Sequence, residues 1–229
     1  MRRVPLNYDW ILFDADDTLF HFDDFAGLSR LFADRGLAFD REAYQAYQQR
    51  NRPLWVAYQN GEIGAREVQQ IRFEPWRELL AMSAGEINAA FLGAMAEVCC
   101  PLPGARELLT ALQSRARLGI ITNGFTDLQR VRLERNHLDQ VFSLVVISEQ
   151  VGVAKPDPRI FDHAMKLMDH PRAERVLMVG DNPHSDILGG NRAGFHTCWL
   201  NHHDTPCPEG ITPDFQVRHL AELQALLLA

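Results

Sequence analysis

Short apolar segments that alternate with amphipathic segments of helical length are the feature that most constrains the fold of this chain. The apolar runs span 8–13, 118–122, 144–148, 176–180 and 197–200, and a further short one lies near Phe215. Amphipathic stretches at 104–115, 126–136, 158–168 and 185–193 separate the later runs, and a closing helix is expected from Leu220. This pattern is typical of buried parallel strands joined by helices. It predicts an α/β fold, a Rossmann-like doubly wound parallel sheet with right-handed crossovers.

The segment between the first two apolar runs departs from this alternation. It contains no convincing strand, and its periodicity predicts helices over 24–35, 41–60, 65–82 and 84–99. An all-helical insert at this point would lie over the carboxyl ends of the strands, where open α/β sheets bind ligands. We therefore expect an α/β core domain formed by 1–20 and 102–229, and a helical cap domain formed by 21–101.

Composition narrows the range of partners. The chain has 229 residues, 46% of them hydrophobic, and a formal net charge of −7. This acidic balance disfavours nucleic acid polymers and acidic membrane surfaces, because no basic surface is available to bind them. No run is long enough for a signal peptide or a membrane span, so the cytoplasm is the expected location. An anionic partner is expected to be a small phosphorylated metabolite; the sequence does not indicate an oligomeric state.

Two carboxylates follow the first expected strand. Asp14 and Asp16 are two residues apart, so their side chains are expected to point toward the same cleft. Neighbouring carboxylates raise each other's pKa unless a cation lies between them. The pair is therefore expected to form a metal site, a nucleophile with an acid and base partner, or both; the alternative is an ordinary Asp-rich turn.

The next two expected strands end in residues suited to an anion. Thr122, Asn123 and Gly124 precede a helix, where a hydroxyl and free backbone N–H groups can bind phosphoryl oxygens. Lys155, before a proline, could neutralise both a phosphoryl group and a nucleophilic carboxylate. The alternatives are a helix-capping turn for the first motif and a solvated surface lysine for the second.

Asp181 and Asp186 follow the fourth expected strand. Mg²⁺ prefers a few carboxylate oxygens, with waters and substrate phosphate as its other ligands. Asp14, the backbone carbonyl of Asp16 and Asp181 suit it, with Mn²⁺ as an alternative cation. Asp186 is expected to orient Lys155 or a metal-bound water without binding the metal itself, or else to cap the helix that follows.

Taken together, these four motifs resemble those of the haloacid dehalogenase superfamily. They are DADDT at 14–18, TNG at 122–124, KP at 155–156 and GDNPHSD at 180–186. The helical insert resembles that family's cap, which lies between its first two motifs.

The resemblance implies a metal-dependent phosphatase. It implies that Asp14 attacks phosphorus to form an aspartyl-phosphate, and that Asp16 protonates the leaving oxygen and then activates water. Thr122, with the amides of Asn123 and Gly124, would hold the transferring group. Lys155 would offset its charge.

Longer segments resemble bacterial pyrimidine 5'-nucleotidases of the YjjG type, namely 53–61, 94–99, 119–135 and 151–156. This resemblance implies hydrolysis of nucleoside monophosphates such as UMP, dUMP and dTMP. In the cap, Trp55 and Tyr58 would stack on the base, and Asn60 or Gln59 would read its edge. The alternative is that these aromatic residues form the core of the cap.

Other functions remain open at this point. A phosphatase or phosphomutase acting on another phosphometabolite, such as a sugar phosphate, would share these motifs. A haloacid dehalogenase is disfavoured, because the dehalogenases of the superfamily lack the acid at the position of Asp16. Arg130, Arg132 and Arg135 are expected to form an exposed helix face.

Overall fold

The computed structural model describes residues 8–228, so the assignment of 1–7 and 229 to the core domain lies outside the described residues. Within these residues, six strands form one parallel sheet in the order β3-β2-β1-β4-β5-β6. The strands are β1 (Trp10–Phe13), β2 (Arg117–Thr122), β3 (Leu144–Ile147), β4 (Val176–Gly180), β5 (His196–Leu200) and β6 (Phe215–Val217). The predicted α/β class and parallel sheet are confirmed.

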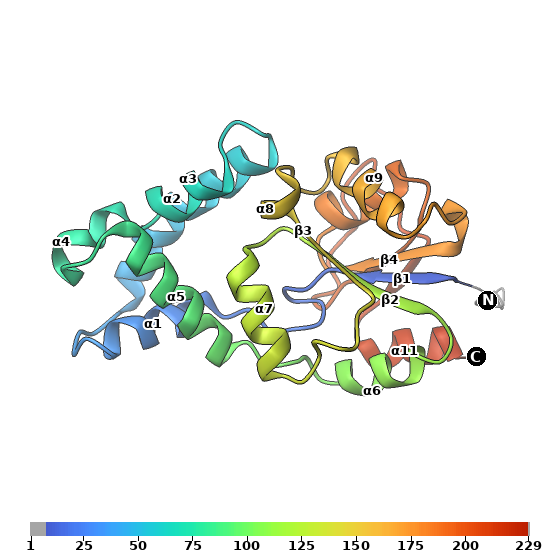
Figure 1. Cartoon of the computed structure of the whole chain (residues 1–229), viewed down its shortest axis with the longest axis horizontal. Helices are drawn as coiled ribbons and strands as arrows, with labels where there is room; N and C mark the ends of the chain where they lie inside the picture. The colour runs from blue at the N-terminus through green and yellow to red at the C-terminus, as the bar shows by residue number, and fades with distance from the viewer. Residues whose placement is uncertain (1–7, 229) are drawn as a thin grey trace.

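Successive side chains of each strand point to opposite faces of this sheet, and both faces are apolar. Helices therefore cover both faces. Ile11 and Phe13 of β1 pack in a cluster with α6 (Ala105–Leu112), α7 (Thr126–Arg135) and α11 (Leu220–Leu228). Trp10 and Leu12 point to the opposite face. There they pack in a cluster with α9 (Pro158–Leu167) and the neighbouring α8 (Ser148–Val151). Figure 1 shows α9 on one side of the sheet and α6 and α11 on the other.

The five helices that directly follow β1 gather at one end of the molecule, as Figure 1 shows. They are α1 (Asp24–Ala33), α2 (Arg41–Gln59), α3 (Ala65–Ile71), α4 (Arg77–Leu80) and α5 (Ala84–Val98). Local signals set their starts: Asp23, Asp40 and Ser83 each accept a hydrogen bond from a first-turn amide. Their apolar faces share one buried cluster, which continues onto Phe125 and Leu128 at the start of α7.

Two predicted helices are interrupted. The helix predicted over 65–82 is divided into α3, a 3₁₀ turn η1 (Glu74–Trp76) and α4, because Pro75 lacks an N–H and disfavours helical backbone before it. The helix predicted over 185–193 begins instead as a π-helical turn, η3 (Pro183–Ile187), before α10 (Leu188–Arg192). A further 3₁₀ turn, η2 (Ala173–Arg175), precedes β4.

Between residues 8 and 228 no single helix is long and apolar enough to cross a bilayer. One bent pair, Ala65–Leu80 with Ala84–Val98, reaches that length and composition together, with 99° between its two parts.

Candidate active site

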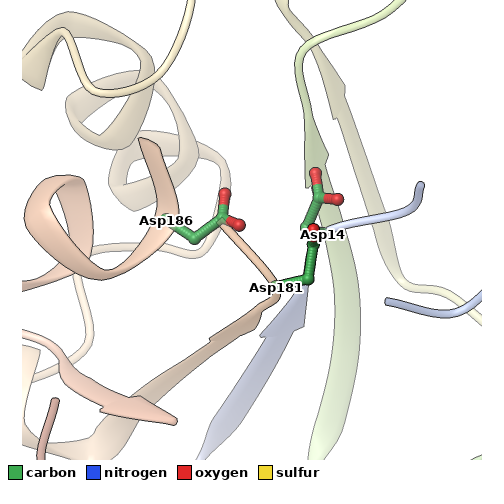
Figure 2. A group of neighbouring side chains, drawn as sticks. All are labelled: Asp14, Asp181 and Asp186. Atoms are coloured by element: carbon green, nitrogen blue, oxygen red, sulfur yellow. The ribbon is translucent and has the colours of Figure 1, made fainter. Parts of the chain in front are cut away.

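Three carboxylates meet at the carboxyl edge of the sheet. Asp14 follows β1, Asp181 follows the neighbouring strand β4, and Asp186 lies in η3. One oxygen from each lies within 4.8 Å of the other two. Figure 2 shows the side chains of Asp14 and Asp186 directed toward the same space above the strand ends. The topology of the sheet therefore brings together residues that are far apart in sequence.

The crowding of three carboxylates makes this triad a candidate site for a cation. Burial, then the charges of neighbouring carboxylates, raises the pKa of Asp181 to about 9. Burial likewise raises the pKa of Asp14 to about 7, against the opposing charge of Lys155. Buried carboxylates in such proximity are ionised together only when positive charge compensates them. The carboxylate oxygens of Asp14 and Asp181 fit a divalent cation that prefers oxygen ligands.

Lys155 supplies one of the positive charges. Its Nζ donates hydrogen bonds to Asp14 Oδ1 and to the Ile121 carbonyl, both at 2.6 Å, and lies 2.8 Å from Asp186 Oδ1. The residue is only 1% exposed. Burial alone would lower the pKa of Lys155, but Asp14 and Asp186 outweigh that effect and raise it. Lys155 therefore remains charged beside Asp14, and it is not a solvated surface residue.

Asp186 is engaged mainly by protein groups. Its Oδ1 accepts from Ser185 Oγ at 3.1 Å in addition to Lys155, and its Oδ2 accepts from the Asn182 backbone amide at 3.0 Å. Gly180 permits this position, because a Cβ there would overlap the Asp186 carboxylate. These contacts leave Asp186 better suited to orienting Lys155 than to binding a cation directly.

The turn after β2 differs in detail from the expected anion seat. The Asn123 side chain donates to the Lys155 carbonyl at 2.9 Å and accepts from its amide at 2.7 Å, so it holds the Lys155 backbone. The Gly124 amide, expected to bind a phosphoryl oxygen, donates to Ser148 Oγ at 3.1 Å. Thr122 Oγ1 is buried and has no hydrogen-bond partner within the described chain. The hydroxyl of Thr122 thus stays without a hydrogen-bond partner among the described residues, although Thr122 does not itself line the cavity above the triad.

A cavity of about 460 Å³ opens above the triad, between the sheet edge and the inserted helices. This volume lies within the range of small-molecule sites. On the sheet side it is lined by Asp14, Asp16, Asn123, Gly124, Phe125, Lys155, Asp181 and Asp186. The inserted helices contribute Asp24, Tyr47, Gln48, Asn51, Trp55, Gln59, Arg72, Phe91 and Leu92. A ligand held at the triad would therefore extend onto α2 and α5.

The fold and this motif order agree with comparisons to known proteins. The family model described as haloacid dehalogenase-like hydrolase matches residues 8–194. The chain belongs to this family. The hydrolase is 55% identical to the pyrimidine 5'-nucleotidase YjjG of Escherichia coli, over 97% of this chain and 99% of that protein. It is 32% identical to the pyrimidine 5'-nucleotidase PynA of Streptococcus pneumoniae, over 94% of this chain and 93% of that protein.

A solved structure shows the same architecture. The HAD-hydrolase YfnB of Bacillus subtilis, crystallised bound to magnesium, superimposes on the hydrolase with a TM-score of 0.82 at 29% identity. The match covers 97% of this chain and 99% of that one.

The hydrolase also contains a buried arginine that the sequence analysis placed wrongly. Arg132 on α7 was expected on an exposed face with Arg130 and Arg135, but it is fully buried. Its Nη1 donates to Asp16 Oδ1, and its Nε and Nη2 donate to Gln129 Oε1. Because Leu128 lies four residues earlier on the same helix and is also buried, this face of α7 points inward. The four-residue spacing from Leu128 is the sequence feature that could have indicated a buried Arg132.

The base-binding residues expected in the cap are only partly on the cavity wall. Trp55 lines the cavity, and its ring centroid lies 5.2 Å from that of Phe125. Tyr58 and Asn60 do not line it: Tyr58 is buried in the cluster of the inserted helices, and Asn60 bonds Glu62 at the surface. Residues three or four positions apart share a helix face. The residues of α2 on the cavity side, Tyr47, Gln48, Asn51, Trp55 and Gln59, follow that spacing.

Proposed function

We propose that this hydrolase is a divalent-metal-dependent 5'-nucleotidase that releases phosphate from pyrimidine nucleoside monophosphates such as UMP, dUMP and dTMP. The observation that carries the proposal is the single cavity shared by Asp14, Lys155 and a cap wall of aromatic and amide side chains. Its acidic floor suits phosphoryl chemistry, and the cap wall suits a flat polar base. The similarity to proteins named pyrimidine 5'-nucleotidase over nearly the whole chain supports the same substrate class.

Asp14 is the proposed nucleophile. One of its oxygens forms a bond to phosphorus while the bond from phosphorus to the 5' oxygen breaks, leaving an aspartyl-phosphate. Asp16 donates a proton to the departing 5' oxygen, and then takes a proton from the water that attacks phosphorus and frees Asp14. The contact between Lys155 and Asp14 supports a role for Lys155 in offsetting negative charge at the reacting centre.

We propose Mg²⁺ as the physiological cation, with Mn²⁺ as a substitute. Asp14, the backbone carbonyl of Asp16 and Asp181 would hold it, while Asp186 remains bonded to Lys155. Bound there, the cation would neutralise charge so that an anionic carboxylate can approach an anionic phosphate. The magnesium-bound structure of YfnB supports this choice.

The helices of 21–101 are proposed to act as a cap domain over the core formed by 1–20 and 102–229. Their contacts with the cavity support a role in excluding water and in selecting the substrate. The interdomain movement described for YfnB is consistent with a cap that opens and closes.

A metal-controlled substrate panel tests the proposal. Phosphate release is measured from UMP, dTMP, AMP, GMP, ribose 5-phosphate and a hexose phosphate, with Mg²⁺, with Mn²⁺ and after chelation. We expect kcat/KM to be highest for the pyrimidine nucleotides and activity to vanish on chelation. Equal rates on purine nucleotides and sugar phosphates would contradict the pyrimidine assignment, and phosphate transfer to a sugar rather than to water would indicate a phosphomutase.

A further inference from the structure

The inserted helices place one permanently charged side chain on the cavity wall. Arg72, just after α3, is 4% exposed. Its guanidinium carbon lies 4.8 Å from the ring centroid of Phe73 and 5.1 Å from those of Phe91 and Phe125. One terminal nitrogen, Nη2, donates to Asn88 Oδ1. Aromatic faces and one amide therefore hold this guanidinium against the cavity.

Burial outweighs the favourable effects of Tyr47 and Asp24 and lowers the pKa of the Arg72 guanidinium. No carboxylate within residues 8–228 forms a salt bridge with it, and its Nε has no hydrogen-bond partner there. Asp24, which also lines the cavity, accepts hydrogen bonds from Tyr44 and Gln48 instead. A buried charge without such compensation is costly to the fold. Proteins retain such local violations mainly at functional sites.

A second buried polar atom on the same wall also lacks a partner. Asn51 is 7% exposed, and its Oδ1 has no hydrogen-bond partner within the described chain. Asn51 lies four residues after Tyr47 and four before Trp55, so the three share one face of α2, and all three line the cavity. Arg72 Nε and Asn51 Oδ1 are therefore a buried donor and a buried acceptor that have no partner within the described chain and belong to side chains of this wall.

We propose that Arg72 and Asn51 recognise the imide edge of a uracil or thymine base. The inference rests on the proposed nucleotidase function and assigns its specificity to named residues. In an imide, a carbonyl oxygen stands next to N3–H; Arg72 Nε donates to O4, which cytosine replaces with an amino group, and Asn51 Oδ1 accepts from N3–H. Trp55 and Phe125, whose ring centroids lie 5.2 Å apart, would contact the base from one apolar side.

This arrangement discriminates against cytosine. The N3 atom of cytosine carries a lone pair in place of a hydrogen, so Asn51 Oδ1 would face another acceptor. A site built to hydrogen-bond a substrate rejects an analogue that leaves its buried groups unpaired. A pyrimidine nucleotide with an imide is therefore favoured over CMP even though the two have nearly the same shape.

The test compares three substrates in the full-length, metal-loaded enzyme: UMP, CMP and ribose 5-phosphate, which lacks a base. Arg72→Met is expected to lower kcat/KM for UMP by about 10- to 100-fold, the loss of one charged hydrogen bond, and to leave ribose 5-phosphate nearly unchanged. Asn51→Leu is expected to lower the preference for UMP over CMP by about tenfold. Arg77→Met is the matched control, because Arg77 is a half-exposed arginine of the same helical segment paired with Glu74.

Calorimetric titration provides a readout that does not depend on turnover. Uridine and cytidine lack the phosphate and share the same ribose, so the difference between their affinities reports on the base site alone. The wild-type protein is expected to bind uridine more tightly than cytidine. Arg72→Lys keeps the charge but loses Nε–H, and it is expected to reduce that difference in a protein whose circular dichroism spectrum is unchanged.

The possible results distinguish a failure of base recognition by Arg72 and Asn51 from a failure of the proposed nucleotidase function. Equal slowing of UMP and ribose 5-phosphate by Arg72→Met would mean that Arg72 only supports the cap, and would contradict the inference. A wild-type preference for UMP that survives in both Arg72→Met and Asn51→Leu would contradict the inference alone. A wild-type enzyme that hydrolyses ribose 5-phosphate as well as UMP would contradict the nucleotidase proposal and the inference together.

Discussion

Arg132 is fully buried on α7 and donates a hydrogen bond to the carboxylate of Asp16, the proposed acid and base of the reaction. Gln129, one turn earlier on the helix, accepts two hydrogen bonds from the same guanidinium. The position of the Asp16 side chain is therefore set by a helix that follows the second motif. The contact between Arg132 and Asp16 also means that Asp16 compensates a buried charge. It therefore links a proposed catalytic residue to the stability of the fold.

The first prediction concerns that link. Asp16→Ala leaves the Arg132 charge buried without its partner, so it is expected to lower the free energy of unfolding by about 2 to 4 kcal/mol. The double variant Asp16→Ala, Arg132→Met is expected to recover part of this loss, because the uncompensated charge is gone. Chemical denaturation of the four proteins in this cycle measures the coupling. Additive losses would show that the pair contributes nothing.

The second prediction concerns pH and metal. Burial and neighbouring charge raise the pKa of Asp181 from 3.8 to about 9, so the folded metal-free protein binds more protons than the unfolded chain between these values. Its stability is therefore expected to fall as the pH rises through this window. Mg²⁺ binds the ionised carboxylates and should raise Tm more at pH 9 than at pH 6. Thermal melts at both pH values measure this difference.

Asp181→Asn is the control for that experiment, because it removes the acid whose pKa is most raised. In this variant the metal-free protein should lose less stability with rising pH, and Mg²⁺ should raise Tm less. A Mg²⁺ effect of the same size at both pH values and in both proteins would contradict the proposed ligand set.

The third prediction concerns Gly180. A methyl group at this position would overlap the Asp186 carboxylate, so Gly180→Ala is expected to displace Asp186 from Lys155 and from the Asn182 amide. Overpacking of this kind costs about 1 to 3 kcal/mol, and kcat should fall with it because Lys155 loses its support. Denaturation and steady-state kinetics measure the two effects. Gly93→Ala on α5, where a Cβ meets nothing within 4 Å, is the control: it should leave kcat unchanged and raise the free energy of unfolding by up to about 1 kcal/mol, because Ala favours a helix over Gly.

Much of the fold and the centre of the site could be predicted from the sequence because their signals are local. Each strand is an apolar run that ends in a polar motif, and the parallel sheet brings those ends to one edge. Asp14, Lys155, Asp181 and Asp186 meet there, as the order of the motifs suggested. Their catalytic roles stay predictions until the variants are measured.

The remaining residues could not be placed with the same certainty because long-range packing determines their environment. Arg132 has charged neighbours in sequence, and only the helix period relative to Leu128 indicates that it is buried. Arg72 falls inside the helix predicted over 65–82, but α3 ends at Ile71 before Pro75, so the predicted helix face did not indicate where its side chain lies. Asn51 is a polar residue within a helix, and only its spacing of four residues from Trp55 on α2 indicates that it lies on the cavity wall.

Trapping the phosphorylated enzyme tests most directly whether Asp14 is the nucleophile. Protein turning over UMP with Mg²⁺ is quenched rapidly in acid, digested and analysed by mass spectrometry, with Asp14→Asn as the control. We predict one added phosphoryl group on the peptide that contains Asp14, absent from the variant, whose kcat should fall by at least about a thousandfold. A phosphoryl group on another residue, or an Asp14→Asn variant that retains substantial turnover, would contradict the assignment of Asp14 as the nucleophile.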